Sequence, residues 1–102
     1  MKRFFLGVSL ALLAVTQSGC IVGSVYAYKA NSAASALEQA KVLGADRLAE
    51  YEYWFAHENL QKAMEEAAEA EYGEGIIFAD LAKEYADKAI EKSGAAHRGA
   101  GR

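Results

Sequence analysis

His57 and Glu58 are adjacent residues whose types could begin a catalytic zinc motif in this 102-residue chain. A zinc site of the HExxH kind needs a second histidine one helical turn later, so that two imidazoles reach the same ion. Gln61 occupies that position, and the remaining histidine, His97, stands near the C-terminus. The sequence therefore predicts that the protein binds no metal.

Other patterns that support catalysis are missing, because the sequence has no glycine-rich phosphate loop, no nucleophile elbow and no Cys/His pair. An acidic run is typical of a solvated helix face; it comprises Glu65, Glu66, Glu69, Glu71 and Glu74. The formal net charge is −3, and the stretch from Asp46 to Lys92 holds 13 acidic against 5 basic residues. Such a surface repels phosphate backbones. We therefore expect no enzyme, no cofactor and no nucleic-acid partner.

Four large aromatic residues close together in the sequence are candidates for a partner surface: Tyr51, Tyr53, Trp54 and Phe55. On a helix, residues so closely spaced point in different directions, so they cannot all enter one core. Exposed aromatic clusters favour protein interfaces. The sequence leaves two alternatives open, in which either a preceding helix of the same chain or another protein covers these side chains.

Cys20 is the only cysteine, so no disulfide can form within the chain, and its position indicates a different chemistry. Lys2 and Arg3 make a positive start, residues 4–15 form an apolar run, and residues 16–20 are small or polar. These three regions are typical of a secretory signal peptide, whose apolar core has about 7 to 15 residues. Such a run is too short to cross a bilayer alone, which takes about 20 residues.

Ser18, Gly19 and Cys20 resemble the lipobox of bacterial lipoproteins, in which Leu, then Ala or Ser, then Gly or Ala precede the cysteine. Gln17 departs from that pattern, because Leu is usual there. The resemblance implies that a peptidase removes residues 1–19. It also implies that Cys20 carries a diacylglycerol on its sulfur and an acyl chain on its nitrogen, which together hold a protein firmly on a membrane.

The residue after the cysteine bears on which membrane is used. In enteric lipoproteins an Asp at that position favours the inner membrane, and here the residue is Ile21. The resemblance therefore implies a protein anchored in the outer membrane and facing the periplasm, with the inner membrane as the alternative.

A second interpretation of the same region is an uncleaved, single-pass membrane helix. No charged residue occurs between Arg3 and Lys29, and residues 4–28 are long enough to cross a membrane with tilt. The three polar residues at positions 16–18 oppose this interpretation, because they would lie in the middle of the span. Both interpretations export the rest of the chain, since the positive N-terminus stays inside.

The exported part is predicted to be all-α, because it is rich in alanine and the chain has no proline. A first helix is expected up to Gly44, with apolar residues spaced four and three apart: Tyr26, Ala30, Ala33, Leu37 and Ala40. Asp46 is expected to cap a second helix. Its stripe consists of Ala49, Tyr53, Ala56, Leu60, Ala63, Ala67 and Ala70.

Residues 72–75, Tyr-Gly-Glu-Gly, predict a turn, because two glycines so close together are costly inside a helix. A third helix should follow and end at Ser93-Gly94, with Phe78, Ala82, Tyr85 and Ala89 on its apolar stripe. Two amphipathic helices joined by a short turn form an antiparallel hairpin. The predicted organisation is a signal peptide at 1–19, a lipid-anchored linker helix at 20–44, a helical hairpin at 45–93 and a disordered tail at 94–102.

Residues 59–63, Asn-Leu-Gln-Lys-Ala, and 81–89, Leu-Ala-Lys-Glu-Tyr-Ala-Asp-Lys-Ala, resemble short helical domains of unknown function in Gram-negative envelope lipoproteins. The hairpin also resembles a single tetratricopeptide-type repeat, with a large aromatic early in its first helix and a tyrosine at its turn. Either tetratricopeptide-like packing or coiled-coil packing would hold the three helices together. Both resemblances rest on packing residues, so they imply a fold more than an activity.

The function expected from these features is a non-catalytic binding or scaffolding module, whose partner is another envelope protein or another copy of the chain. The alternative is a structural coiled-coil oligomer like the major murein lipoprotein, which links the membrane to peptidoglycan. That family ends in a lysine, whereas this chain ends in Arg102, and Gly44, Gly73 and Gly75 interrupt a long rod.

Overall fold

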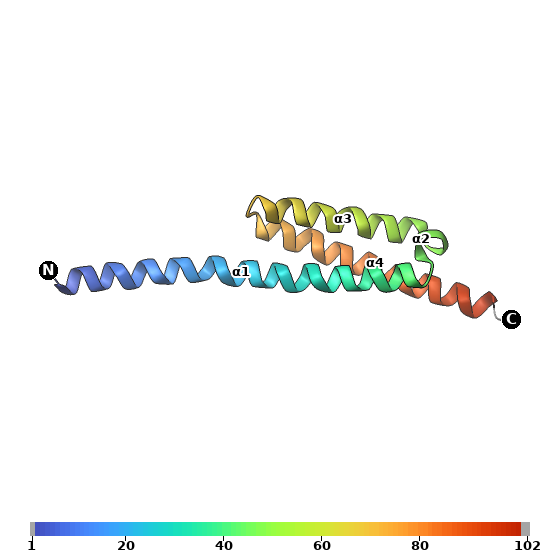
Figure 1. The fold of residues 1–102 in the computed structure, drawn as a ribbon, viewed down its shortest axis with the longest axis horizontal. Helices are drawn as coiled ribbons and strands as arrows, with labels where there is room; N and C mark the ends of the chain where they lie inside the picture. The colour runs from blue at the N-terminus through green and yellow to red at the C-terminus, as the bar shows by residue number, and fades with distance from the viewer. Residues whose placement is uncertain (1, 101–102) are drawn as a thin grey trace.

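The computed structural model describes the backbone of residues 2–100 and the side chains of residues 3, 5 and 20–99. Within residues 2–100 every regular element is an α-helix and no strand occurs, which confirms the predicted all-α class. The helices are α1 (Lys2–Val42), α2 (Ala45–Leu48), α3 (Glu50–Ala68) and α4 (Tyr72–Ala100) (Figure 1).

The helices α3 and α4 form the expected antiparallel hairpin, and α1 lies along it in the same direction as α4 (Figure 1). At one end of this three-helix bundle the ring centroids of Tyr26 and Tyr72 are 5.9 Å apart. At the other end His97 Nε2 lies 2.7 Å from the carbonyl oxygen of Leu43. Because α1 continues N-terminal to the bundle, the molecule is elongated and measures 80 × 20 × 15 Å.

Gly44 ends α1 as predicted, in a left-handed conformation (φ 79°) that costs glycine little. The prediction that Asp46 caps the next helix is wrong. The chain forms the single-turn helix α2 directly after Gly44, and α3 begins at Glu50, with no side-chain cap on either helix. Ala45 and Ala49 are both completely buried, so the packing of their methyl groups overrides the capping preference of Asp46.

The turn between α3 and α4 lies at residues 69–71 and not at residues 72–75, where the two glycines predict it. Ala70 takes the positive φ (61°) in this turn, a conformation that is unfavourable for a residue with a Cβ. The glycines lie in the first turns of α4 instead. The predicted position is therefore wrong by about one helical turn.

Gly75 does not form the turn but allows three helices to pack closely. It is buried where α4 meets both other long helices. A Cβ at this position would stand 3.0 Å from the ring of Tyr26 on α1 and 3.2 Å from the carbonyl oxygen of Ala63 on α3. The three helices can therefore meet here only because residue 75 has no side chain.

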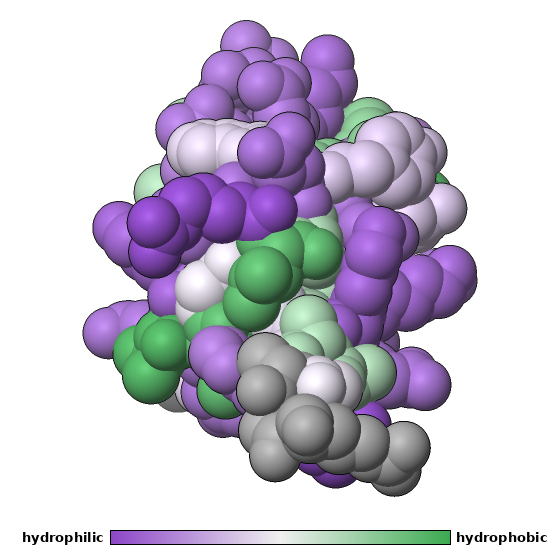
Figure 2. Space-filling model, turned by 90° about the vertical axis from the view of Figure 1, so that its right-hand side faces the viewer, coloured by the Kyte–Doolittle hydropathy of each residue, from purple (hydrophilic) through white to green (hydrophobic). Residues whose placement is uncertain are grey.

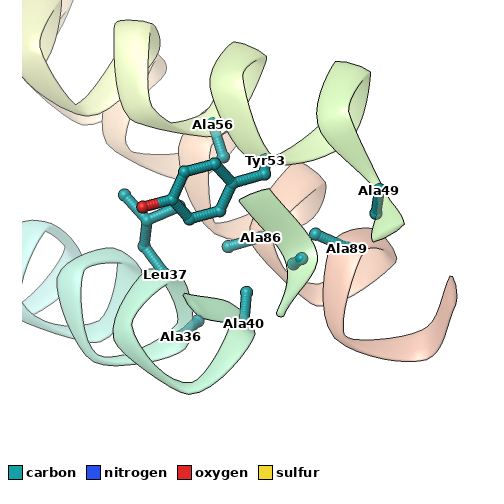
Figure 3. Close-up of a cluster of buried hydrophobic side chains, with 9 residues drawn as sticks. Ala36, Leu37, Ala40, Ala49, Tyr53, Ala56, Ala86 and Ala89 are labelled. Carbon is teal, nitrogen blue, oxygen red and sulfur yellow. The ribbon is translucent and has the colours of Figure 1, made fainter. Parts of the chain in front are cut away.

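The core of the bundle consists almost entirely of alanine (Figure 3). Its members are Ala33, Ala36, Leu37 and Ala40 of α1, Tyr53, Ala56 and Ala63 of α3, and Ala79, Ala82, Ala86 and Ala89 of α4. Phe78 and Tyr85, which we expected in the core, are only half-buried. Methyl groups let the helices approach closely, and that spacing leaves no room for rings between α4 and its neighbours.

The helix α4 is longer than the sequence predicts. It passes through Ser93-Gly94, so the expected disordered tail is wrong for residues 94–100, while residues 101 and 102 lie outside those described. Ser93 is completely buried, and His97 holds the extension against the end of α1. Figure 2 looks onto this end of the molecule, where green hydrophobic side chains gather among purple hydrophilic ones. Val42 is exposed near this end of the bundle.

Replacing Gly75 with alanine should destabilise the protein by about 1 to 3 kcal/mol, the usual cost of overpacking, because the backbone carbonyl of Ala63 cannot move aside. Gly73→Ala is the matched control, since nothing lies within 4 Å of a Cβ there. It should be neutral or stabilising by up to about 1 kcal/mol. Urea unfolding followed by circular dichroism measures both. Equal stability of the two variants would contradict the packing role of Gly75.

Candidate binding surface

The four aromatic residues that the sequence singles out face different environments. The ring of Tyr53 is buried, with 5% of the residue exposed, and lies between α3 and Leu37 of α1 (Figure 3). Tyr51 and Trp54 are 65% and 50% exposed, and Phe55 is half-buried. The preceding helix of the chain therefore covers Tyr53 only, so Tyr53 belongs to the core and the other three rings form the surface.

An open groove of about 520 Å³ runs between α3 and α4 where these three rings lie. Its lining residues are Tyr51, Trp54, Phe55, Glu58, Asn59, Lys62 and Phe78, and none of them comes from α1. In a bundle of three helices, the groove between two helices lies on the side away from the third. The groove is therefore the face of the hairpin that α1 leaves uncovered.

The rings in the groove support one another. Tyr51 stacks on Phe55 with centroids 5.7 Å apart, and Phe55 lies 4.4 Å from Tyr85 of α4. Trp54 packs at 4.9 Å, edge to face, against the buried Tyr53. Aromatic pairs at these distances contribute about 0.5 to 1.5 kcal/mol beyond their burial. The exposed rings are therefore supported by contacts with one another and with the buried Tyr53.

Two lysines rest on the rings at the groove. The ammonium of Lys62 lies 5.7 Å from the centroid of Phe78, and that of Lys88 lies 4.4 Å from the centroid of Tyr85. Both contacts are cation–π interactions. The hydrogen bond with Glu84, at 3.1 Å, raises the pKa of the Lys88 ammonium. The groove thus combines an apolar floor with charged edges.

Polar groups along the groove can add hydrogen bonds but lack the arrangement of a catalytic site. Asn59 Nδ2 donates to the carbonyl oxygen of Phe55 at 2.8 Å, which leaves the amide oxygen of Asn59 as an acceptor. Glu58 and Lys62 form no ion pair with any residue that the structure describes. This set of side chains can recognise a ligand by aromatic contact and a few polar interactions.

The histidines lie apart from each other and from any acidic cluster. His57 packs beside Trp54, with ring centroids 5.5 Å apart, and His97 contacts the end of α1. Among the described residues, no three His, Cys, Asp or Glu side chains converge as metal ligands would.

Cys20 is exposed and unpaired by disulfide, and it precedes the start of the bundle directly. Gly23, three residues later, faces the ring of Tyr72, which would stand 3.8 Å from a Cβ there. The segment predicted as a linker helix is therefore packed on α4. Ser18 and Gly19 lie in α1, but their side chains are outside those described. In the described part of the chain, no helix has a stretch both long and apolar enough to span a bilayer.

Phe78 and Tyr85 are the surface residues that the sequence analysis assigned to the core. They stand seven residues apart on α4, and alanines flank them at Ala79, Ala82 and Ala86. Those alanines occupy the contact with α1 and α3, and the rings are displaced to the groove side. A helix with two competing stripes, one of alanine and one aromatic, is the signal that could have identified them.

One comparison with known proteins gives a match. A family described as a domain of unknown function (DUF4398) matches residues 29–99. The match begins nine residues after Cys20 and includes α1 from Lys29 onward, all of α3, α4 as far as Gly99, and the aromatic groove. No curated protein and no solved structure is significantly similar to the chain.

Tyr53→Ala and Tyr51→Ala should separate core from surface. Tyr53→Ala should cost about 3 to 5 kcal/mol, the usual penalty for removing a buried ring. Tyr51→Ala should cost about 0.5 to 1.5 kcal/mol, because only its ring contacts with Phe55 and Tyr85 are lost. Chemical denaturation measures both. Similar losses in the two variants would show that Tyr51 is as important to the fold as Tyr53.

Proposed function

The chain belongs to the DUF4398 family of domains of unknown function, and on that premise we propose that it is a non-catalytic binding module, held in the cell envelope by lipid on Cys20. Its partner occupies the aromatic groove between α3 and α4. The observation that carries this proposal is the exposure of Tyr51 and Trp54 in a groove whose rings are already ordered. Aromatic side chains left in water are typical of interface hot spots.

The shape of the groove favours a helix as the partner's binding element. A groove between two antiparallel helices accepts an amphipathic helix, whose apolar residues lie on the floor and whose polar residues meet the edges. Glu58 and Lys62 offer one charge of each sign at those edges. The hairpin would then act as a single tetratricopeptide-like unit, with α1 covering the face opposite the partner.

The proposed anchor agrees with where packing begins. Each buried residue of the core lies at Ala33 or beyond, among the residues whose side chains are described. Cleavage before Cys20 would therefore remove none of them. The lipobox-like residues and Ile21 favour the outer membrane and the periplasm, while an inner-membrane anchor or an uncleaved N-terminal helix are the alternatives.

A self-associating rod like the major murein lipoprotein is the competing function. Such a rod would bury the stripe of α1 between copies of the chain. Here α1 buries Ala33, Leu37 and Ala40 inside a single chain, which favours the binding module over the rod.

A photo-crosslinking amino acid at position 54 should capture a partner in membranes, because it stands in the groove. The matched control is the same amino acid at Ser35, which is exposed on α1 away from the groove. We expect one discrete crosslinked protein from position 54 and none from position 35, measured by mass spectrometry of the purified adducts. Adducts between copies of this chain would favour the self-associating rod, and equal capture at both positions would contradict the groove as the binding site.

Intact mass of the membrane-extracted protein tests the anchor. The wild type should lack residues 1–19 and carry the mass of a diacylglycerol and an acyl chain on Cys20. Cys20→Ala should keep its N-terminal segment and carry no lipid, because the thiol is the site of attachment. A wild-type protein that retains residues 1–19 without lipid would favour the uncleaved membrane helix.

A further inference from the structure

The side of α1 next to α4 changes character along its length, and from Tyr28 onward it borders a groove that Lys83 and Asp87 of α4 also line. Next to Cys20 it exposes Ile21, Val25 and Tyr28, whose spacings of four and three place them on one stripe. Ile21 is 64% exposed and Tyr28 is 75% exposed. No charged residue occurs between Cys20 and Tyr28. We call the surface of Ile21, Val25 and Tyr28 the apolar stripe.

Beyond Tyr28 the same face of the helix is polar. Continuing the spacing of four and three gives Ser32, Ser35 and Gln39. A protein partner or a second copy lying along α1 would need apolar residues there too, because helix packing continues over several turns. The apolar stripe covers only the two helical turns nearest Cys20. This short length suits contact with the apolar part of a membrane surface at that end of the helix. At about 1.5 Å per residue, the stripe extends about 12 Å from Cys20.

The other two long helices are strongly acidic at this end of the bundle. The end of α3, the turn and the start of α4 carry Glu65, Glu66, Glu69, Glu71 and Glu74, and the sequence has no Lys or Arg between Lys62 and Lys83. The contact of Gly23 with Tyr72 places these carboxylates level with the start of the apolar stripe. Anionic lipid headgroups repel carboxylates, whereas the apolar stripe gains by leaving water.

We propose that the apolar stripe lies in the lipid surface, so that the module leans on α1 and turns its aromatic groove away from the membrane. This inference rests on the proposed lipid anchor at Cys20. With no more than three residues between Cys20 and the first contact with α4, the anchor holds the stripe at headgroup depth. Helices of this kind bury their apolar face about 5 to 10 Å into the interface. The acidic turn and the groove then face the water.

Fluorescence quenching by brominated lipids tests the orientation, because Trp54 is the only tryptophan. Acylated full-length protein would be placed in vesicles of phosphatidylcholine brominated on its acyl chains. In a Trp54→Phe background, Tyr28→Trp reports the apolar stripe and Ser35→Trp reports the polar continuation of the same face. Both positions are solvent-facing on α1, and circular dichroism would check that the fold is retained.

The tryptophan at position 28 should lose most of its fluorescence, while the one at position 35 and the native Trp54 should keep theirs. Equal quenching at positions 28 and 35, no quenching at position 28, or quenching of Trp54 would each overturn the proposed orientation. Intact mass of the same samples separates the two proposals. Protein that carries lipid but shows no quenching at position 28 refutes only the orientation, whereas protein without lipid refutes the anchor itself and the inference with it.

Discussion

The whole bundle depends on how closely three helices approach one another. Alanine occupies almost every position between them, and at the tightest point Gly75 leaves room for the ring of Tyr26 and the carbonyl of Ala63. Close backbones give each methyl group many contacts, but each methyl group buries little area. The fold therefore gains its stability from the precision of this spacing and not from a large apolar volume.

The close spacing of the helices leaves little volume in the core for aromatic rings. Of the four clustered aromatic residues only Tyr53 is buried, where its ring lies beside Leu37 of α1 among the core alanines (Figure 3). Tyr51, Trp54, Phe55 and Phe78 have no room inside and gather in the groove on the uncovered side of the hairpin. The aromatic groove and the alanine core are thus two results of the same constraint.

The sequence predicts the helices and most core positions of α1 and α3, because spacings of four and three are a direct record of which side chains share a helix face. It predicts the ends of the helices less well. Glycine has two uses, as a turn residue and as a packing residue, and the local pattern at Gly73 and Gly75 does not tell them apart. The long-range contact between His97 and Leu43 extends α4 past a glycine that would otherwise end it. For the surface, the pattern identifies the aromatic cluster, and it places Tyr53 on the apolar stripe of the second predicted helix, where the structure buries it.

The short distance between Cys20 and Gly23 has a consequence for where a partner can be met. A lipoprotein with a long flexible linker can search a wide volume above its membrane. With the proposed anchor at Cys20, this chain would have no such slack, because α1 continues directly from Cys20 into the bundle. Trp54 is fourteen residues from the end of α3 that lies nearest Cys20. At about 1.5 Å per residue, Trp54 is about 20 Å along the bundle from that end, and this is its greatest height when the bundle stands upright. Under the proposed anchor, the length of the bundle would therefore fix the reach of the module, and only partners within that distance of the bilayer could meet the groove.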